Sequence, residues 1–428
     1  MASSFFFGQL IGTIIYPSLI SFFGIINSLS LGYFTIFLSY LIIAKYDTYF
    51  ITIISYIISS LAFQICMIGF KQYIVEMSES SKRPIYLLFN LLSQIISGFF
   101  VVLISYLTLD YKYLLLISSV ICILGVILVK LYVVESIRIL FVQGKIEKLM
   151  ENLEYISKIN NSKQYFDEWK RNNKDIFFND NSLNNENLDP LIDKNNDISN
   201  NSEKLKKYNS SDLNELNYLS IWKYPSQVIL IILFSFATFY GNYSLVLSQF
   251  GVGKQKKFFF SLLEGYFCDM IGYFLGILIT ELKNVTRKTC FLFLTFLLSL
   301  IFAIQWIFYS FHNQYSFIFL RIFINSLDAN FNLYNFESFP TLARSTGVAI
   351  NRIFGKFFNI FTPLLMINFM RIAFLCGLIF GIILFLLSLI LGPKEAKDHK
   401  INEFPIEFEK DNCKDNENEE EVGYLLCN

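Results

Sequence analysis

The sequence has few of the charged side chains that water-soluble domains carry on their surfaces. Only 16% of its 428 residues are Asp, Glu, Lys or Arg, whereas 54% are hydrophobic and 18% are aromatic. No charged residue precedes Lys45, and residues 289–320 also lack Asp, Glu, Lys and Arg. Uncharged apolar runs of about 18 residues or more are typical of helices that cross a membrane, where the backbone must satisfy its own hydrogen bonds. The composition therefore excludes a soluble domain and predicts an all-α polytopic membrane protein.

Other scarcities exclude whole classes of chemistry. The two histidines and seven cysteines follow no spacing typical of a metal site or a disulfide framework. There is no Gly-rich stretch ending in Gly-Lys-Ser/Thr, and no Ser/His/Asp set or pair of carboxylates that indicates catalysis. The formal net charge is zero, without a basic aromatic patch for nucleic acid. We expect neither an enzyme nor a cofactor nor a nucleic-acid partner.

Apolar runs dominate what is present, and they predict eleven spans in two groups. The predicted spans are 4–24, 28–44, 48–70, 85–108 and 113–133, then 226–248, 257–280, 289–309, 315–335, 343–368 and 371–392. These spans predict an N-terminal bundle in residues 1–134, a cytoplasmic loop in 135–222, a C-terminal bundle in 223–392 and a disordered tail in 393–428. The loop begins with apolar residues at helical spacing and continues into an Asn-rich segment that we expect to be disordered.

Positive charge predicts which ends of the spans face the cytoplasm. Basic residues follow the third, fifth and seventh spans: Lys71, Lys82 and Arg83; Arg138, Lys145 and Lys148; and Lys283, Arg287 and Lys288. The positive-inside rule then places the central loop and the tail inside and Met1 outside, although "GKQKK" at 253–257 opposes this. The plasma membrane is the expected location.

The two halves share an acid–base spacing at the end of a span. Glu76 stands seven residues before Arg83, and Glu337 stands seven residues before Arg344. A repeated motif indicates an internal duplication, which is common in secondary transporters. Such pairs can hold helix ends together in one state and release them in another. The alternative is that they are ordinary interfacial residues anchoring helix ends.

Several segments together resemble the major facilitator superfamily, and within it the organic cation/anion transporters. "ESIRILFVQGK" is similar to the signature after that family's sixth helix, and "FESFPTLARSTG" to its stretch near helix eleven. "TFYGNYSLVL" is similar to its helix seven, and "KNVTRK" retains basic residues of a cytoplasmic turn. Sugar porters share several of these motifs. The resulting gating set is Glu76, Arg83, Glu135, Arg138, Arg287, Lys288, Glu337 and Arg344.

The sequence departs from the family pattern near its start. Where the family has Asp-x-x-Gly-Arg-Arg, this chain has Ser21, Gly24, Ile25 and Ile26, so the charges of that turn are absent. Gly8 and Gly12 match the second helix, which implies that the first of twelve helices is missing. A truncated gene model is the expected explanation; the alternative is an eleven-span protein that is an inactive relative acting as a membrane partner or sensor.

Charged residues inside spans are the candidates for solute binding, because charge there is costly unless it has a role. Arg352 and Lys356 lie four residues apart and therefore on one helix face. The resemblance places Lys356 where cation transporters carry Asp and anion transporters carry Arg, which favours an anion. The alternative is an internal pair with Asp328 or Asp269.

The other candidates are less specific. Arg321 is placed like the other charged candidates, and the alternative is that it only extends to an interface. Phe239 and Tyr240 could offer aromatic faces to a flat organic ion, and the alternative is that they pack or face lipid. The resulting hypothesis is alternating-access transport of a small organic ion across the lipid bilayer, with or without a coupled ion. A sugar or polyol porter is the alternative within the family.

Overall fold

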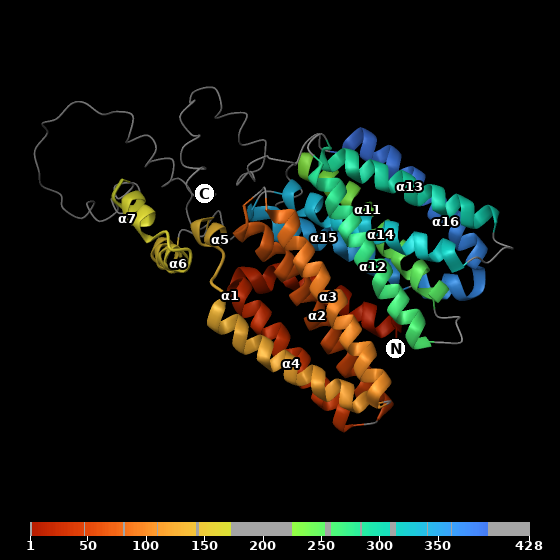
Figure 1. Ribbon diagram of the computed structural model, residues 1–428, viewed down its shortest axis with the longest axis horizontal. Helices are drawn as coiled ribbons and strands as arrows, with labels where there is room; N and C mark the ends of the chain where they lie inside the picture. The colour runs from red at the N-terminus through yellow and green to blue at the C-terminus, as the bar shows by residue number, and fades with distance from the viewer. Residues whose placement is uncertain are drawn as a thin grey trace, which may run out of the picture. The chain divides into compact units, whose positions relative to one another are not determined.

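The computed structural model describes residues 2–46, 48–79, 82–108, 110–142, 145–172, 225–252, 258–282, 285–308, 314–339, 341–360 and 362–392. The regular elements of these ranges are α-helices (Figure 1). They form two compact units, one of residues 1–133 with 221–428 and one of residues 134–220. The Asn-rich segment and the C-terminal tail lie outside the described residues.

The larger unit contains two sets of helices. The N-terminal bundle comprises α1 (Ala2–Lys45), α2 (Tyr49–Met77), α3 (Arg83–Thr108) and α4 (Tyr111–Tyr132). The C-terminal bundle comprises α11 (Pro225–Val252), α12 (Phe258–Glu281), α13 (Arg287–Ile307), α14 (Gln314–Ser338), α15 (Thr341–Asn359) and α16 (Thr362–Leu391). Among the described residues, eight helices are long and apolar enough to cross a membrane. The predicted class of fold is confirmed, while the division into five and six spans stays a prediction.

Some helix bounds differ from the predicted spans. The predicted span 343–368 is broken, because α15 ends at Asn359 and α16 begins at Thr362, while the non-helical residue Phe369 of α16 falls between this span and the next predicted one. α2 continues past residue 70 to Met77, so charged residues that were expected to follow the span lie within the helix.

α1 contains both of the first two predicted spans, separated at Gly24. This glycine has φ 77° and ψ 175°, a conformation that side chains with a Cβ rarely adopt. Both halves of α1 then pack closely on α2. A Cβ on Gly12 would lie 2.4 Å from the Leu61 carbonyl oxygen, and one on Gly32 would lie 2.5 Å from the Cys66 sulfur. Gly24 therefore provides the break between the two halves.

Glycine also brings helices close together in the C-terminal bundle. A Cβ on Gly272 would lie 2.5 Å from the Ile322 carbonyl oxygen, and one on Gly276 would lie 2.6 Å from that of Ser326. The Ser326 hydroxyl donates to the Gly272 carbonyl at 2.7 Å. Small residues four apart, with a hydroxyl bond between helices, are typical of helix contacts in membranes. They hold α12 against α14.

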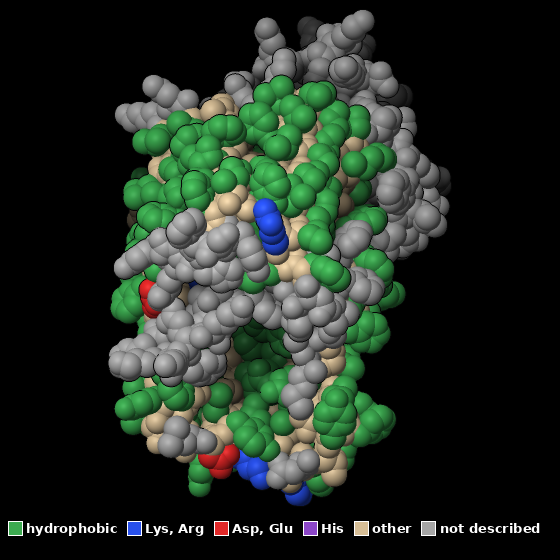
Figure 2. All heavy atoms as spheres, turned by 90° about the vertical axis from the view of Figure 1, so that its right-hand side faces the viewer, with side chains coloured by type: hydrophobic (Ala, Val, Ile, Leu, Met, Phe, Trp, Pro, Cys, Tyr) green, Lys and Arg blue, Asp and Glu red, His purple; other side chains and the backbone are tan. Residues whose placement is uncertain are grey.

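The two bundles meet through specific helices. α1 packs against α15, α3 against α12, and α14 against both α2 and α3. A buried apolar cluster joins them, formed by Leu87 and Leu91 of α3, Ile277 of α12, and Ala329 and Leu333 of α14. Hydrophobic side chains also predominate on the described surface seen in Figure 2, and that face is hollowed near its centre. An apolar exterior suits a bilayer, where lipid takes the place of water.

The smaller unit contains α5 (Ile137–Val142), α6 (Ile146–Ile159) and α7 (Lys163–Asn172). α6 buries Leu149 and Met150. On its exposed side, the Lys158 ammonium lies 2.8 Å from Glu154 and holds the pKa of that carboxyl below its ordinary value. These helices occupy the part of the central loop for which the sequence predicts surface helices.

Candidate functional site

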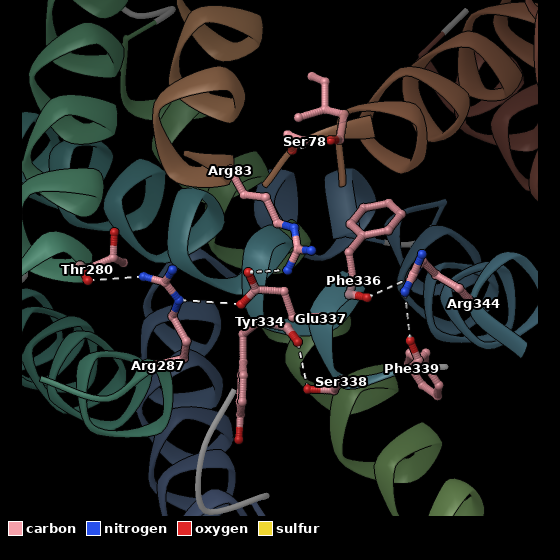
Figure 3. A network of polar contacts seen from close by, with 11 residues as sticks. Ser78, Arg83, Thr280, Arg287, Tyr334, Phe336, Glu337, Ser338, Phe339 and Arg344 are labelled. Carbon is pink, nitrogen blue, oxygen red and sulfur yellow. Dashed lines mark hydrogen bonds and ion pairs between the residues drawn. The ribbon is translucent and has the colours of Figure 1, made fainter. Parts of the chain in front are cut away.

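Glu337, in the last turn of α14, lies between two arginines (Figure 3). Its Oε1 is 3.5 Å from Nη1 of Arg83 in the N-terminal bundle, and its Oε2 is 3.4 Å from Nε of Arg287 in the C-terminal bundle. The three side chains are at most 4% exposed. Arg287 also donates to the Thr280 carbonyl at 3.0 Å. The Glu337 carboxylate thus joins Arg83 of the N-terminal bundle to Arg287 of its own, C-terminal bundle.

Glu76 and Arg344 form the reciprocal contact. Glu76 of α2 lies 3.5 Å from Nη1 of Arg344 in α15, and both side chains are fully buried. Arg344 also donates from Nε to the Phe336 carbonyl at 3.0 Å and from Nη2 to the Phe339 carbonyl at 3.2 Å, at the end of α14 (Figure 3). These bonds satisfy carbonyl groups that a helix C-terminus leaves without intrahelical partners.

Two ion pairs of this group cross between the bundles, whereas the sequence spacing pairs each acid with the base of its own half. Glu76 contacts Arg344, and Glu337 contacts Arg83, each across the interface. Each seven-residue spacing covers a helix end and the turn to the next helix, so the acid and the base start on different helices. We call Glu76, Arg83, Arg287, Glu337 and Arg344 the inter-bundle lock.

The remaining predicted gating residues lie outside this lock. Lys288 donates from Nζ to the carbonyls of Leu389 and Gly392, at 3.1 and 2.8 Å, at the C-terminal end of α16. A cation is favourable at that end of a helix. Glu135 and Arg138 belong to the smaller unit and are half-buried there. Pro340, in the motif around Glu337, lies outside the described residues.

A hydrogen-bonded chain leads from the lock into the N-terminal bundle. The Tyr16 hydroxyl donates to Oε1 of Gln72 at 2.8 Å, and Nε2 of Gln72 donates to Oε1 of Glu76 at 2.7 Å. All three side chains are buried. Neither Tyr16 nor Gln72 belongs to the predicted set, because each is a common residue in an apolar run and only the fold brings them to Glu76.

A second group of charges, the charge cluster, comprises Lys71 of α2, Asp328 of α14, and Arg352 and Lys356 of α15. Electrostatic interactions join Lys71 to Asp328 and Arg352, and join Lys356 to all three of the others. Nη2 of Arg352 donates to the Asn332 amide oxygen at 2.9 Å. Lys71 is 4% exposed, whereas Arg352, Lys356 and Asp328 are half-buried. The structure thus brings Asp328, Arg352 and Lys356 together and adds Lys71.

Lys71 was assigned by the sequence to the basic flank of a span, which is wrong. α2 continues beyond it, and the side chain is buried inside the larger unit. The signal that could have found it is the helical spacing from Gln64 through Lys71 to Gln72 and Glu76, a polar stripe on an otherwise apolar helix. Charge inside a spanning helix normally faces the bundle interior.

Asp269 lies elsewhere, in a network of its own. Its two carboxylate oxygens accept from Nε and Nη2 of Arg321, at 2.6 and 2.7 Å, and Asn325 donates to it at 2.7 Å. Gly265 leaves room for the guanidinium, because a Cβ there would lie 2.6 Å from Nη1. Of the two interpretations of Arg321, extension to an interface is therefore wrong: the residue is 8% exposed and forms a bidentate pair.

The two aromatic candidates pack within the C-terminal bundle. The ring of Phe239 lies 5.0 Å from that of Phe380, centroid to centroid, and contacts Tyr243. Tyr240 is fully buried and packs edge-on against Phe302. In this conformation Tyr240 has no surface for a solute, and only the half-buried Phe239 keeps part of its ring accessible.

Comparison with known proteins identifies the family. A sequence model of the Major Facilitator Superfamily matches residues 1–329, while no match was found among curated protein sequences. The chain is similar to the solved structure of the proton:xylose symporter XylE bound to 6-bromo-6-deoxy-D-glucose, with a TM-score of 0.65 and 15% identity, covering 92% of this chain and 86% of that chain.

Two further structures show the same likeness. XylE from E. coli in a partially occluded inward-open conformation gives a TM-score of 0.61 at 16% identity, covering 92% of this chain and 87% of that one. Its inward-open conformation gives 0.55 at 16% identity, covering 92% and 86%. At such identity the likeness concerns the fold, and the sequence model covers most of the chain. The chain belongs to the Major Facilitator Superfamily and is a multi-pass membrane transporter.

Proposed function

We propose that this protein carries a small organic anion across the membrane by alternating access, binding it at the charge cluster. The observation that carries this proposal is an imbalance of charge: three basic side chains interact electrostatically with a single carboxylate, Asp328. Buried like charges are costly in a membrane protein unless an opposite charge compensates them. An anionic solute supplies that compensation.

The basic residues of the charge cluster come from both bundles, which links solute binding to movement of the bundles. Lys71 comes from the N-terminal bundle, whereas Arg352 and Lys356 come from the C-terminal bundle. Across the interface Lys71 interacts with Asp328 and with Arg352, so without a solute a single carboxylate is shared by all three cations. An anion between them attracts both sides and favours their approach. Occupancy of the site therefore favours closing of the two bundles around the solute, which is the step that alternating access requires.

The inter-bundle lock supports the same proposal from one end of the bundles. Two crossing ion pairs with fully or almost fully buried partners hold α2 and α3 to α14 and α15. For a solute to leave at that end, both pairs must separate. We therefore assign the lock to gating, and the separate pair of Asp269 and Arg321 to holding α12 on α14.

A sugar or polyol remains the second candidate, and one observation favours it. α14 is rich in buried amides, and the side chain of Asn330 is fully buried without a hydrogen-bond partner among the described residues. Amides of this kind recognise hydroxyl groups, and buried ones are rarely left without a partner. The XylE structures also belong to a xylose symporter.

The test compares charge classes of solute. Purified protein in liposomes is assayed for uptake of labelled benzoate, succinate, xylose and tetraethylammonium. We expect uptake of an anion and its loss in Lys356→Asp, which reverses one charge of the cluster. Lys148→Asp makes the same charge change at an exposed position of α6 and should leave uptake unchanged. Uptake of xylose alone would favour the second candidate. Anion uptake that survives Lys356→Asp would contradict the proposed site.

A further inference from the structure

Gln72 stands out because it is bonded at both ends of its amide. Its oxygen accepts from Tyr16 and its nitrogen donates to Glu76, at 2.8 and 2.7 Å. Gln72 is 1% exposed, and Tyr16 is fully buried. Because an ionised carboxylate only accepts hydrogen bonds, Glu76 requires the nitrogen end of the amide, and the oxygen end then accepts from the Tyr16 hydroxyl. The Tyr16 hydroxyl therefore stabilises the orientation of Gln72 that suits Glu76.

Gln72 and Arg344 approach the same carboxylate oxygen, Oε1 of Glu76. Gln72 precedes Glu76 by one turn of α2, whereas Arg344 belongs to α15 in the other bundle. When the bundles separate at this end, Arg344 moves away and Gln72 stays. A hydrogen bond to a charged group is stronger than one between neutral groups. The bond from Gln72 therefore stabilises the Glu76 carboxylate most when Arg344 has moved away.

Arg344 and Glu337, which also form the crossing pairs, have comparable partners in their own bundle. Arg344 keeps the carbonyls of Phe336 and Phe339, and Glu337 keeps Arg287. Gln72 completes this pattern for Glu76. Such partners lower the cost of separating the crossing pairs, because a charge that leaves one partner still has another.

Tyr16 connects Gln72 to the charge cluster. It lies in the first half of α1, the helix that packs across the interface against α15. Tyr16 lies within electrostatic range of both Arg352 and Glu76. Its ring lies over Gly69 of α2, where a Cβ would come to 3.7 Å. Tyr16 thus bonds to the amide that contacts Glu76 and is within range of the charge of Arg352.

From this arrangement we infer that Gln72 is a positioning residue, which holds Glu76 when it separates from Arg344, and that Tyr16 supports this amide and couples it to the charge beside Arg352. An anion at the cluster then acts on the lock through Tyr16 and Gln72. The response to an anion rests on the proposed function; the holding of Glu76 by Gln72 does not.

The first experiment needs no solute. Ser78, the C-terminal cap of α2 near the lock, is 9% exposed and serves as a reporter when replaced by cysteine (Figure 3). Its rate of maleimide labelling in nanodiscs is measured by mass spectrometry of the peptide that contains it. Gln72→Met should slow labelling by about tenfold, because opening then leaves Glu76 without the amide. Tyr16→Phe should slow it less.

The control and the opposing result are also defined by the structure. Tyr243 is a buried tyrosine whose hydroxyl donates to the Ala373 carbonyl at 2.6 Å, away from the lock, so Tyr243→Phe should leave labelling unchanged. If Gln72 only fills space, Gln72→Met would loosen the helices and speed labelling. Faster or unchanged labelling in both Gln72→Met and Tyr16→Phe overturns the inference.

The second experiment adds benzoate. In the otherwise native protein it should raise the melting temperature and slow labelling of residue 78, because occupancy favours closing of the bundles. In Tyr16→Phe the rise in melting temperature should persist while labelling no longer responds. An equal response in both overturns the role of Tyr16 and leaves the anion site standing. Absence of any effect of benzoate on the native protein counts against the proposed function, while the solute-free labelling still decides the role of Gln72.

Discussion

Exchanging the charges of Glu76 and Arg344 tests whether the lock is a pair or a larger network. If only the pair mattered, the double variant Glu76→Arg/Arg344→Glu would restore the contact that each single change destroys. The structure predicts that it does not. A glutamate at position 344 would face the carbonyl oxygens of Phe336 and Phe339, which now accept bonds from the arginine at 3.0 and 3.2 Å.

The magnitude follows from burial and bond count. Both partners are fully buried, so removing one of them leaves a buried charge and costs about 3–5 kcal/mol. Charge exchange recovers the ionic attraction but not the two bonds to carbonyl groups, each worth about 1.5–3 kcal/mol. The double variant should therefore remain at least about 3 kcal/mol short of the native free energy of unfolding. Because the same two bonds hold the side chain at position 344 where it meets residue 76, their loss leaves the exchanged pair misaligned and the closed state weakened.

Two assays measure the effect of these variants on the lock. Maleimide labelling of Ser78→Cys reports how often the lock opens, and uptake into liposomes reports turnover. We expect rapid labelling and low uptake in the single and the double variants alike, and an intermediate result for Arg344→Lys, which keeps a cation able to donate. Native labelling and uptake in the double variant would refute the reasoning, because the carbonyl groups would then contribute nothing to the lock.

Two further predictions use neighbouring or paired residues as controls for each other. Arg287→Ala should reduce uptake, because Glu337 loses its partner in the same bundle. Lys288→Ala should leave uptake near native and lower only the melting temperature, since Lys288 caps α16. Equal uptake in both variants would contradict the assignment of Arg287 to the lock. Asp269→Asn and Arg321→Met should each lower the melting temperature, at a cost in the free energy of unfolding of about 3–5 kcal/mol for each single variant. The double variant should be less destabilised than the sum of the two single costs, as a double-mutant cycle of unfolding would measure. Strict additivity would mean that the bidentate pair does not couple the two residues.

The sequence predicted the class of fold from its lack of charge. Long runs without Asp, Glu, Lys or Arg leave few structures other than membrane helices, since no other segment satisfies its backbone in lipid. The sequence also identified Gly24 as the retained residue of a turn, and the structure shows the break there, at a positive φ that glycine accommodates. These are local properties, so local patterns suffice to find them.

The limits of the helices were predicted less well where charge lies inside a helix. Lys71 ended the predicted span, although α2 continues to Met77. A lysine in an apolar run has the same local appearance whether it extends to an interface or faces the interior of a bundle. Only the neighbours that the fold supplies, Asp328 above all, distinguish the two.

The sequence by itself thus determined that the chain is a helical membrane protein with an acid–base motif repeated in each half. It also identified two cations in the span that resembles the family's eleventh helix. The tertiary structure decided which charges meet: Glu76 with Arg344, Glu337 with Arg83 and Arg287, and Asp269 with Arg321. The physical reason is that pairing depends on which helix ends the bundles bring together. Spacing along the chain fixes only which residues share a helix face or a turn.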